Sequence, residues 1–135
     1  MRDAWLRRAL VFSGVWNILG GIGALVNPAQ HFQQLYTLTL DLDDPLQAFF
    51  FRGFWLCVAA WGVGYLAAAW LPHARRPILI AGGVGKLAFA GGAISLYQEG
   101  FGTGLLLSLG VTDLVFAALF AFALLRPSTP EEAKP

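Results

Sequence analysis

Long apolar segments, each ended by proline, glycine or polar residues, dominate the hydrophobic pattern of this chain. Four of them are long enough to cross a hydrocarbon core of about 30 Å as a helix, which takes about 20 residues. They cover residues 9–26, 46–71, 77–96 and 104–125. Helices are expected because lipid does not tolerate the unpaired edge of a sheet. The pattern therefore predicts an all-α fold, a polytopic membrane protein built as a bundle of four transmembrane helices.

The longest polar segment, residues 28–45, lies between the first two predicted spans. Phe32, Leu35 and Tyr36 recur there at helical spacing, which predicts a short amphipathic helix on the outer membrane surface. Residues 37–42 alternate like a strand but have no evident partner. Two interpretations of this segment stay open, a surface cap over the bundle and a lid over a binding site.

Composition supports the membrane interpretation. Of the 135 residues, 57% are hydrophobic and only 13% are charged, whereas a water-soluble domain carries about 25% charged residues. This scarcity of charge excludes a soluble enzyme, and a net charge of +1 provides no field to attract nucleic acid. We expect one transmembrane domain over residues 1–126 and a disordered polar tail over residues 127–135.

Basic residues gather on one side of the predicted spans, and the opposite loops hold only acidic residues. Lysine and arginine mark the cytoplasmic side of membrane proteins, so both termini are predicted to be cytoplasmic, in a bacterial inner (plasma) membrane. The basic residues are Arg2, Arg7, Arg8, Arg75, Arg76, Arg126 and Lys134, and the acidic residues of the opposite loops are Asp41, Asp43, Asp44 and Glu99.

Four strongly polar side chains, Asn17, Arg52, Lys86 and Asp113, lie inside the predicted spans, where such groups are costly and commonly functional. At a rise of about 1.5 Å per residue, Asn17, Lys86 and Asp113 lie about 13 to 15 Å below the outer ends of their spans. Arg52 lies about 9 Å deep by the same measure. Small residues flank Asn17, Lys86 and Asp113 at helical spacing, as they do where membrane helices pack closely. We therefore predict one polar core of four residues that faces the interior of the bundle.

Three interpretations of this polar core stay open. Lys86 and Asp113 could form an ion pair that only fixes the register of two neighbouring helices. Arg52 leaves two cations against one anion, and an unbalanced positive charge could hold an anionic headgroup, a carboxylate or a quinone oxygen. Asp113 could alternatively take up and release a proton beside Lys86 during transport.

Aromatic residues complete the candidate site, and other chemistry is weakly represented. Trp61 and Tyr65, four residues apart, and Tyr97 are candidates to line a slot for a flat ligand. His31 and the single cysteine, Cys57, have no neighbours at the spacing of metal ligands or of a nucleophile and its base. We therefore expect no metal site and no catalytic residues, and the sequence does not identify a cofactor.

Several short motifs resemble the small bacterial four-span proteins of the DoxX-like families. They are Arg8 before a glycine-rich first span, Arg52-Gly53, Trp61-Gly62-Val63-Gly64-Tyr65, the basic turn His73-Ala74-Arg75-Arg76-Pro77 and Gly85-Lys86. The resemblance extends over most of the chain. It implies a membrane subunit of a quinone-linked oxidoreductase, as in some members, and it assigns no role to any single residue.

The sequence thus predicts a non-enzymatic membrane protein whose polar core binds or transports a small amphiphilic or anionic ligand. A lipid, a quinone or a carboxylate-like compound that enters from the outer side would suit this site. The alternative is a non-catalytic anchor or accessory subunit, for which Gly91 and Gly92, away from the face of Lys86, could contact a partner helix. The expected partners are the lipid bilayer and a second membrane subunit or further copies of the chain, and not nucleic acid.

Overall fold

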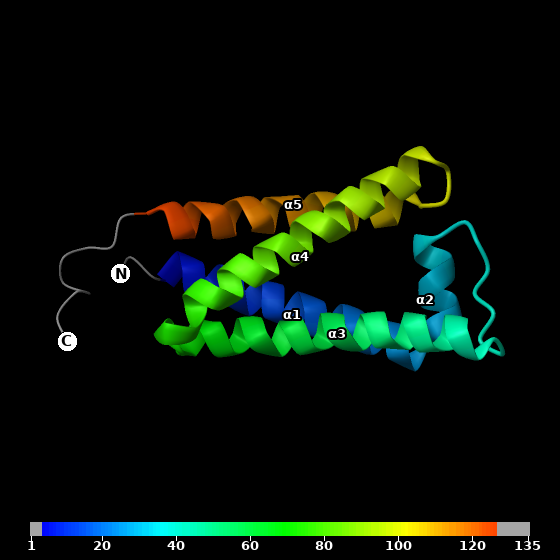
Figure 1. Cartoon of the computed structure of the whole chain (residues 1–135), viewed down its shortest axis with the longest axis horizontal. Coiled ribbons are helices and arrows are strands. Elements are labelled where there is room, and N and C mark those ends of the chain that lie inside the picture. The colour runs from blue at the N-terminus through cyan, green and yellow to red at the C-terminus, as the bar shows by residue number, and fades with distance from the viewer. Residues whose placement is uncertain (1–3, 127–135) are drawn as a thin grey trace.

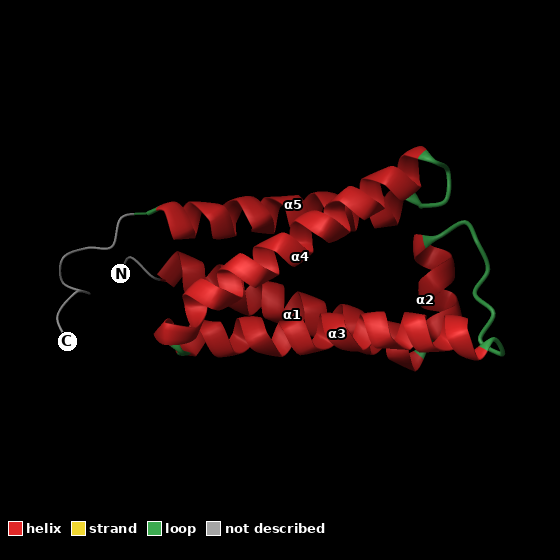
Figure 2. Ribbon diagram, in the orientation of Figure 1, coloured by secondary structure: helices red, strands yellow, loops and turns green. Residues whose placement is uncertain are grey.

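The computed structural model describes residues 4–126, and this part of the chain is helical with short connections (Figures 1 and 2). Its helices are α1 (Ala4–Val26), α2 (Pro28–Leu35), α3 (Pro45–Trp70), α4 (Pro72–Gln98) and α5 (Gly104–Leu125). Helices α1, α3, α4 and α5 are each long and apolar enough to cross a membrane, which confirms the all-α prediction and its four long apolar helices. The predicted tail, residues 127–135, lies outside the described residues.

Helix α4 begins earlier than the sequence predicts. The third span was expected from residue 77, but the helix starts at Pro72, so the basic residues of the expected turn belong to its first turns. Proline suits the first turn of a helix because its missing N–H would have no partner there. The guanidinium of Arg75 donates hydrogen bonds to the carbonyls of Ala68 (3.1 Å) and Ala69 (3.3 Å) near the end of α3. Arg75 therefore ties the beginning of α4 to the end of α3.

Small residues bring the long helices together in two pairs, α1 with α3 and α4 with α5. A Cβ atom on Gly62 would lie 2.7 Å from the carbonyl oxygen of Gly14, and one on Gly14 would lie 2.8 Å from that of Gly62. The backbones of α1 and α3 are therefore in direct contact, as at small-residue interfaces in membranes. In the second pair, a Cβ atom on Gly110 of α5 would lie 2.9 Å from the Cβ of Ala93 in α4.

The two pairs diverge along the molecule. Helix α4 starts beside α3 at the end where α1 begins, here called the terminal end, and crosses obliquely towards the other end, here called the α2 end (Figure 1). The buried apolar residues accordingly form two separate clusters. One contains Leu6, Leu10, Tyr65, Ala68, Leu79, Phe116 and Phe120, and the other contains Ala24, Leu35, Phe51, Trp55, Ala93 and Leu106.

Helix α2 lies across the α2 end of the molecule and confirms the predicted short amphipathic helix. The N–H of Thr37 donates to the carbonyl of Phe101 at 3.0 Å, and its hydroxyl donates to the carbonyl of Gly100 at 2.9 Å. Both acceptors lie in the α4–α5 turn, residues 99–103. In return, the N–H and the hydroxyl of Thr103 donate to the carbonyls of Leu35 (2.9 Å) and Gln34 (2.7 Å). The segment after α2, for which the sequence showed no partner, is therefore paired with the α4–α5 turn.

The contact between the backbones of α1 and α3 gives a first prediction. Gly62→Ala should lower the free energy of unfolding by about 1–3 kcal/mol, because the new methyl group overlaps the backbone of α1. Gly92→Ala is the matched control, since a Cβ atom there meets nothing within 4 Å and alanine favours the helix. Thermal unfolding in detergent, followed by circular dichroism, should show a lower midpoint only for Gly62→Ala. Equal midpoints for the two variants would contradict the close contact.

Candidate functional site

A cavity of about 470 Å³ lies between the two helix pairs, and all five helices contribute to its walls. This volume is within the usual range for small-molecule sites. Most of the wall is aromatic or aliphatic, and representative residues are Trp16, Leu19, Phe54, Val58, Phe89 and Leu109. The divergence of α4 from α3 thus leaves an apolar space large enough for part of an organic ligand.

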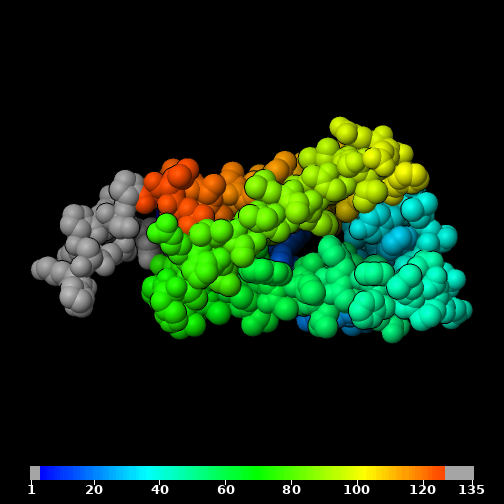
Figure 3. Space-filling view, in the orientation of Figure 1, coloured from blue at the N-terminus to red at the C-terminus, as the bar shows by residue number. Residues whose placement is uncertain are grey.

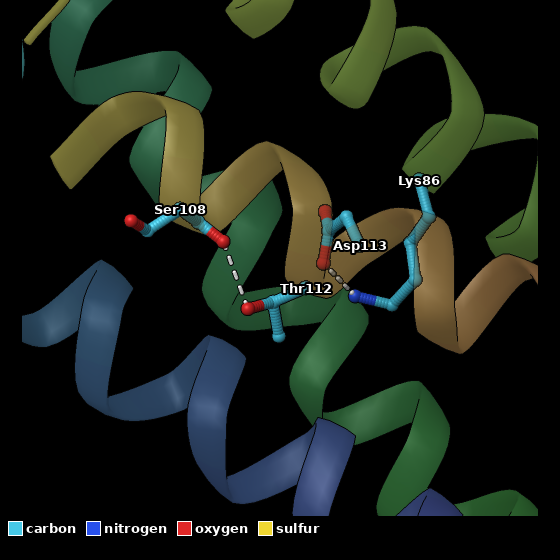
Figure 4. A network of polar contacts seen from close by, with 4 residues as sticks. All are labelled: Lys86, Ser108, Thr112 and Asp113. Carbon is cyan, nitrogen blue, oxygen red and sulfur yellow. Dashed lines mark hydrogen bonds and ion pairs between the residues drawn. The ribbon is translucent and has the colours of Figure 1, made fainter. Parts of the chain in front are cut away.

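An ion pair between Lys86 of α4 and Asp113 of α5 lines this cavity (Figure 4). The Nζ atom of Lys86 lies 2.6 Å from Oδ1 of Asp113, and the side chains are 3% and 15% exposed. The ammonium also lies over the rings of Tyr65 and Phe116, 5.5 and 5.0 Å from their centres, and such ring faces attract cations. The ion pair considered from the sequence is therefore present, and the ammonium is stabilised by one carboxylate and two aromatic rings.

Several polar groups of the cavity form no hydrogen bond within residues 4–126. Among them are the amide of Asn17, the hydroxyl of Tyr65 and the second carboxylate oxygen of Asp113. The hydroxyl of Thr112, by contrast, donates to the carbonyl of Ser108 in its own helix at 2.9 Å (Figure 4), a common bond for threonine in helices. The cavity therefore offers hydrogen-bonding groups to a ligand from α1, α3 and α5.

Two of the predicted site residues, Arg52 and Tyr97, do not line the cavity. The side chain of Arg52 is exposed, because its neighbour Phe51 occupies the buried face of α3, and Tyr97 is exposed near the end of α4. The prediction of an excess positive charge in the core is therefore wrong, since Lys86 and Asp113 balance each other. The predicted residues that do line the cavity are Asn17, Trp61, Tyr65, Lys86 and Asp113.

Helix α2 adds His31 and Gln34 to the cavity wall, and neither was predicted from the sequence as a site residue. The rings of His31 and Trp55 meet edge to face, with centres 4.5 Å apart, and Nε2 of His31 is buried without a hydrogen-bond partner. Burial lowers the pKa of His31 below its usual value, so the imidazole is neutral near pH 7. Helical spacing could have indicated that His31 faces the interior, because it precedes the buried Leu35 by about one helical turn.

The geometry defines the class of this protein as an all-helical protein with four helices that could span a membrane and an internal cavity. Comparisons with protein-family models, with curated proteins and with solved structures gave no match to this chain. Within residues 4–126, no three or more His, Cys, Asp or Glu side chains gather in a way that could hold a metal ion. The cavity is therefore the feature of this fold that points to a function.

The buried ion pair gives a second prediction. Lys86→Met should lower the free energy of unfolding by about 3 kcal/mol, because it leaves the carboxylate of Asp113 without its partner. Asp113→Leu should cost a similar amount, and the double variant should cost less than the sum of the two. Thermal unfolding of all three variants in detergent measures this coupling. Strictly additive losses would show that the two charges do not stabilise each other.

His31 gives a third prediction, on pH. Its pKa is lowered in the folded state, so the unfolded segment takes up a proton first as the pH falls below about 6.5. The contribution of neutral His31 to the stability of α2 is therefore fully present above this pH and decreases below it. Hydrogen exchange of the α2 amides, corrected for intrinsic rates, should accelerate from pH 7 to pH 5.5.

The control for this pH prediction is His31→Gln, in which the extra acceleration should be absent. Asp44 does not interfere, because hydrogen bonds from the backbone N–H groups of Leu46 and Gln47 lower the pKa of this exposed carboxyl. It therefore titrates at more acid pH. An unchanged pH response in His31→Gln would assign the effect to another group.

Proposed function

We propose that this chain is a multi-pass membrane protein that binds a small uncharged amphiphile in the cavity. Four helices suit a membrane by length and apolar character. Charges at the ends of the molecule support an orientation with cytoplasmic termini in a bacterial inner membrane. Of the described residues, Arg7, Arg8, Arg75, Arg76 and Arg126 belong to the terminal end, whereas Asp41, Asp43, Asp44 and Glu99 belong to the α2 end.

The single observation that carries the proposal is the combination of apolar walls with unpaired hydrogen-bonding groups beside a neutralised ion pair. Apolar pockets with a few polar groups are the usual form of small-molecule sites. The amide of Asn17 can both donate and accept a hydrogen bond, and the free oxygen of Asp113 can accept one. A hydroxyl, an ester or a quinone carbonyl next to an apolar chain would satisfy these groups.

An anionic ligand fits the cavity less well than the sequence suggested. That expectation depended on the positive charge of Arg52, which lies outside the cavity. The ammonium of Lys86 is already paired with Asp113, and a buried charge without a partner is costly. Because of this balance, we favour an uncharged head over a carboxylate.

A comparison of two probes with the same chain tests the proposal. Monomyristin, which is uncharged, should bind more tightly than myristate, and tryptophan fluorescence can measure both because Trp16, Trp55 and Trp61 line the cavity. Asn17→Leu should weaken monomyristin binding about tenfold, the effect of losing one buried hydrogen bond.

The matched control is Arg52→Gln, which removes a positive charge but keeps a polar side chain at a position outside the cavity. It should leave the affinity for monomyristin unchanged. Tighter binding of myristate, abolished by Arg52→Gln, would overturn the proposal in favour of an anionic ligand.

An accessory subunit is the second candidate, and one observation favours it. Gly91 and Gly92 are exposed on α4, and a Cβ atom on either would meet nothing within 4 Å. Such a smooth face allows close approach of a partner helix, as expected of a DoxX-like subunit of a membrane complex. Purification in mild detergent distinguishes the two functions, since a stoichiometric second protein would support the subunit and the chain alone would count against it.

A further inference from the structure

The cavity is bounded at both ends of the molecule by contacts between helices, and it opens to the side between α3 and α4. Towards the terminal end, α3 and α4 are in contact, because a Cβ atom on Gly82 would lie 2.5 Å from the hydroxyl oxygen of Tyr65. At the α2 end, hydrogen bonds of Thr37 and Thr103 hold α2 against the α4–α5 turn. Between these ends, the space-filling view shows a hollow between α3 and α4 in which α1 is visible (Figure 3).

Residues at the rim of this opening both line the cavity and face outwards. On α3 they are Phe54 and Trp61, which are 43% and 37% exposed, and Cys57, which is also exposed. On α4, Gly85 is an exposed cavity residue whose Cβ atom would meet nothing within 4 Å. The rings of Phe54 and Phe89 stack across α3 and α4 at 6.3 Å and border the opening on the side of α2.

With α3 and α4 spanning the membrane as proposed, the opening lies in the hydrocarbon layer. Cys57 and Gly85 lie near the middle of two helices that are each long enough to span a membrane. The rim carries no charged side chain among the residues named above, so it matches lipid chains rather than water. A ligand arriving from the outer aqueous side would instead have to displace α2 and break its hydrogen bonds to the α4–α5 turn.

We infer that the opening between α3 and α4 is the entrance to the cavity and that the ligand is a lipid-like compound with an uncharged head and an apolar chain. The head reaches the free polar groups of Asn17 and Asp113, and the chain extends between the helices into the bilayer. This inference rests on the proposed function and replaces the expected entry from the outer side. A compound without a chain would have no contact with the rim.

Photolabelling of the full chain in lipid nanodiscs tests the entrance. The probe is monomyristin with a diazirine in its acyl chain, and unlabelled monomyristin competes with it. Mass spectrometry should find competed adducts at Cys57 and Trp61, on the rim. Gly85→Leu, which narrows the opening, should reduce these adducts severalfold, whereas Gly92→Leu on the exposed face of the same helix should not.

Two more variants keep the test decisive. Cys57→Phe narrows the opening from α3 and replaces Gly85→Leu if that variant is not helical by circular dichroism. Thr103→Val removes the hydroxyl bond to α2 and should leave the rate of probe binding unchanged if entry is lateral.

The possible results separate the two proposals. Competed adducts on α2 and the α4–α5 turn, with faster binding in Thr103→Val and no effect of Gly85→Leu, would overturn the lateral entrance while ligand binding stands. Absence of any competed labelling, together with unchanged tryptophan fluorescence, would overturn ligand binding itself.

Discussion

The ammonium of Lys86 imposes the main physical constraint on this molecule. An amine buried at 3% exposure among apolar helices must meet a negative charge, because an isolated charge in such surroundings is very costly. Asp113 supplies that charge from α5, and the rings of Tyr65 and Phe116 add their negative faces. This one pair requires α4 and α5 to face each other in a fixed register, and it sets the polar end of the cavity that both helices line.

The cavity arises from an uneven distribution of small and large side chains. Gly14 and Gly62 allow the backbones of α1 and α3 to touch, whereas no such contact holds α3 against α4 beyond Gly82. There the large rings of Phe54 and Trp61 fill the interface only in part, since both remain exposed to a considerable extent. Van der Waals packing drives helix association in membranes, and close packing is found within the two pairs, so the opening lies at the less closely packed interface between them.

Sequence reasoning predicted the four long apolar helices and considered the pairing of Lys86 with Asp113, because length, hydropathy and helical rise are local properties. It did not predict that Arg52 faces outwards, because the depth of a residue along a helix does not determine which side of the helix it is on. Arg52 follows the buried Phe51 by one residue, and this step along the helix turns its side chain outwards. It could not show that α2 covers the cavity. The bonds that hold α2 join Thr37 to the α4–α5 turn, more than sixty residues away in sequence.

Hydrogen bonds between the two helix pairs, as far as residues 4–126 show, occur only at the ends of the molecule. Arg75 ties α4 to α3 at the terminal end, and the segment after α2 is tied to the α4–α5 turn at the other. Along the middle, α3 and α4 meet through apolar contacts and through the ammonium of Lys86, which lies over the ring of Tyr65. Helix association in membranes depends on van der Waals packing, and among residues 4–126 this part of the α3–α4 interface has no hydrogen bond to add to that packing. Hydrogen bonds therefore fix the two ends of the cavity, and its side between α3 and α4 has no such bond within the described residues.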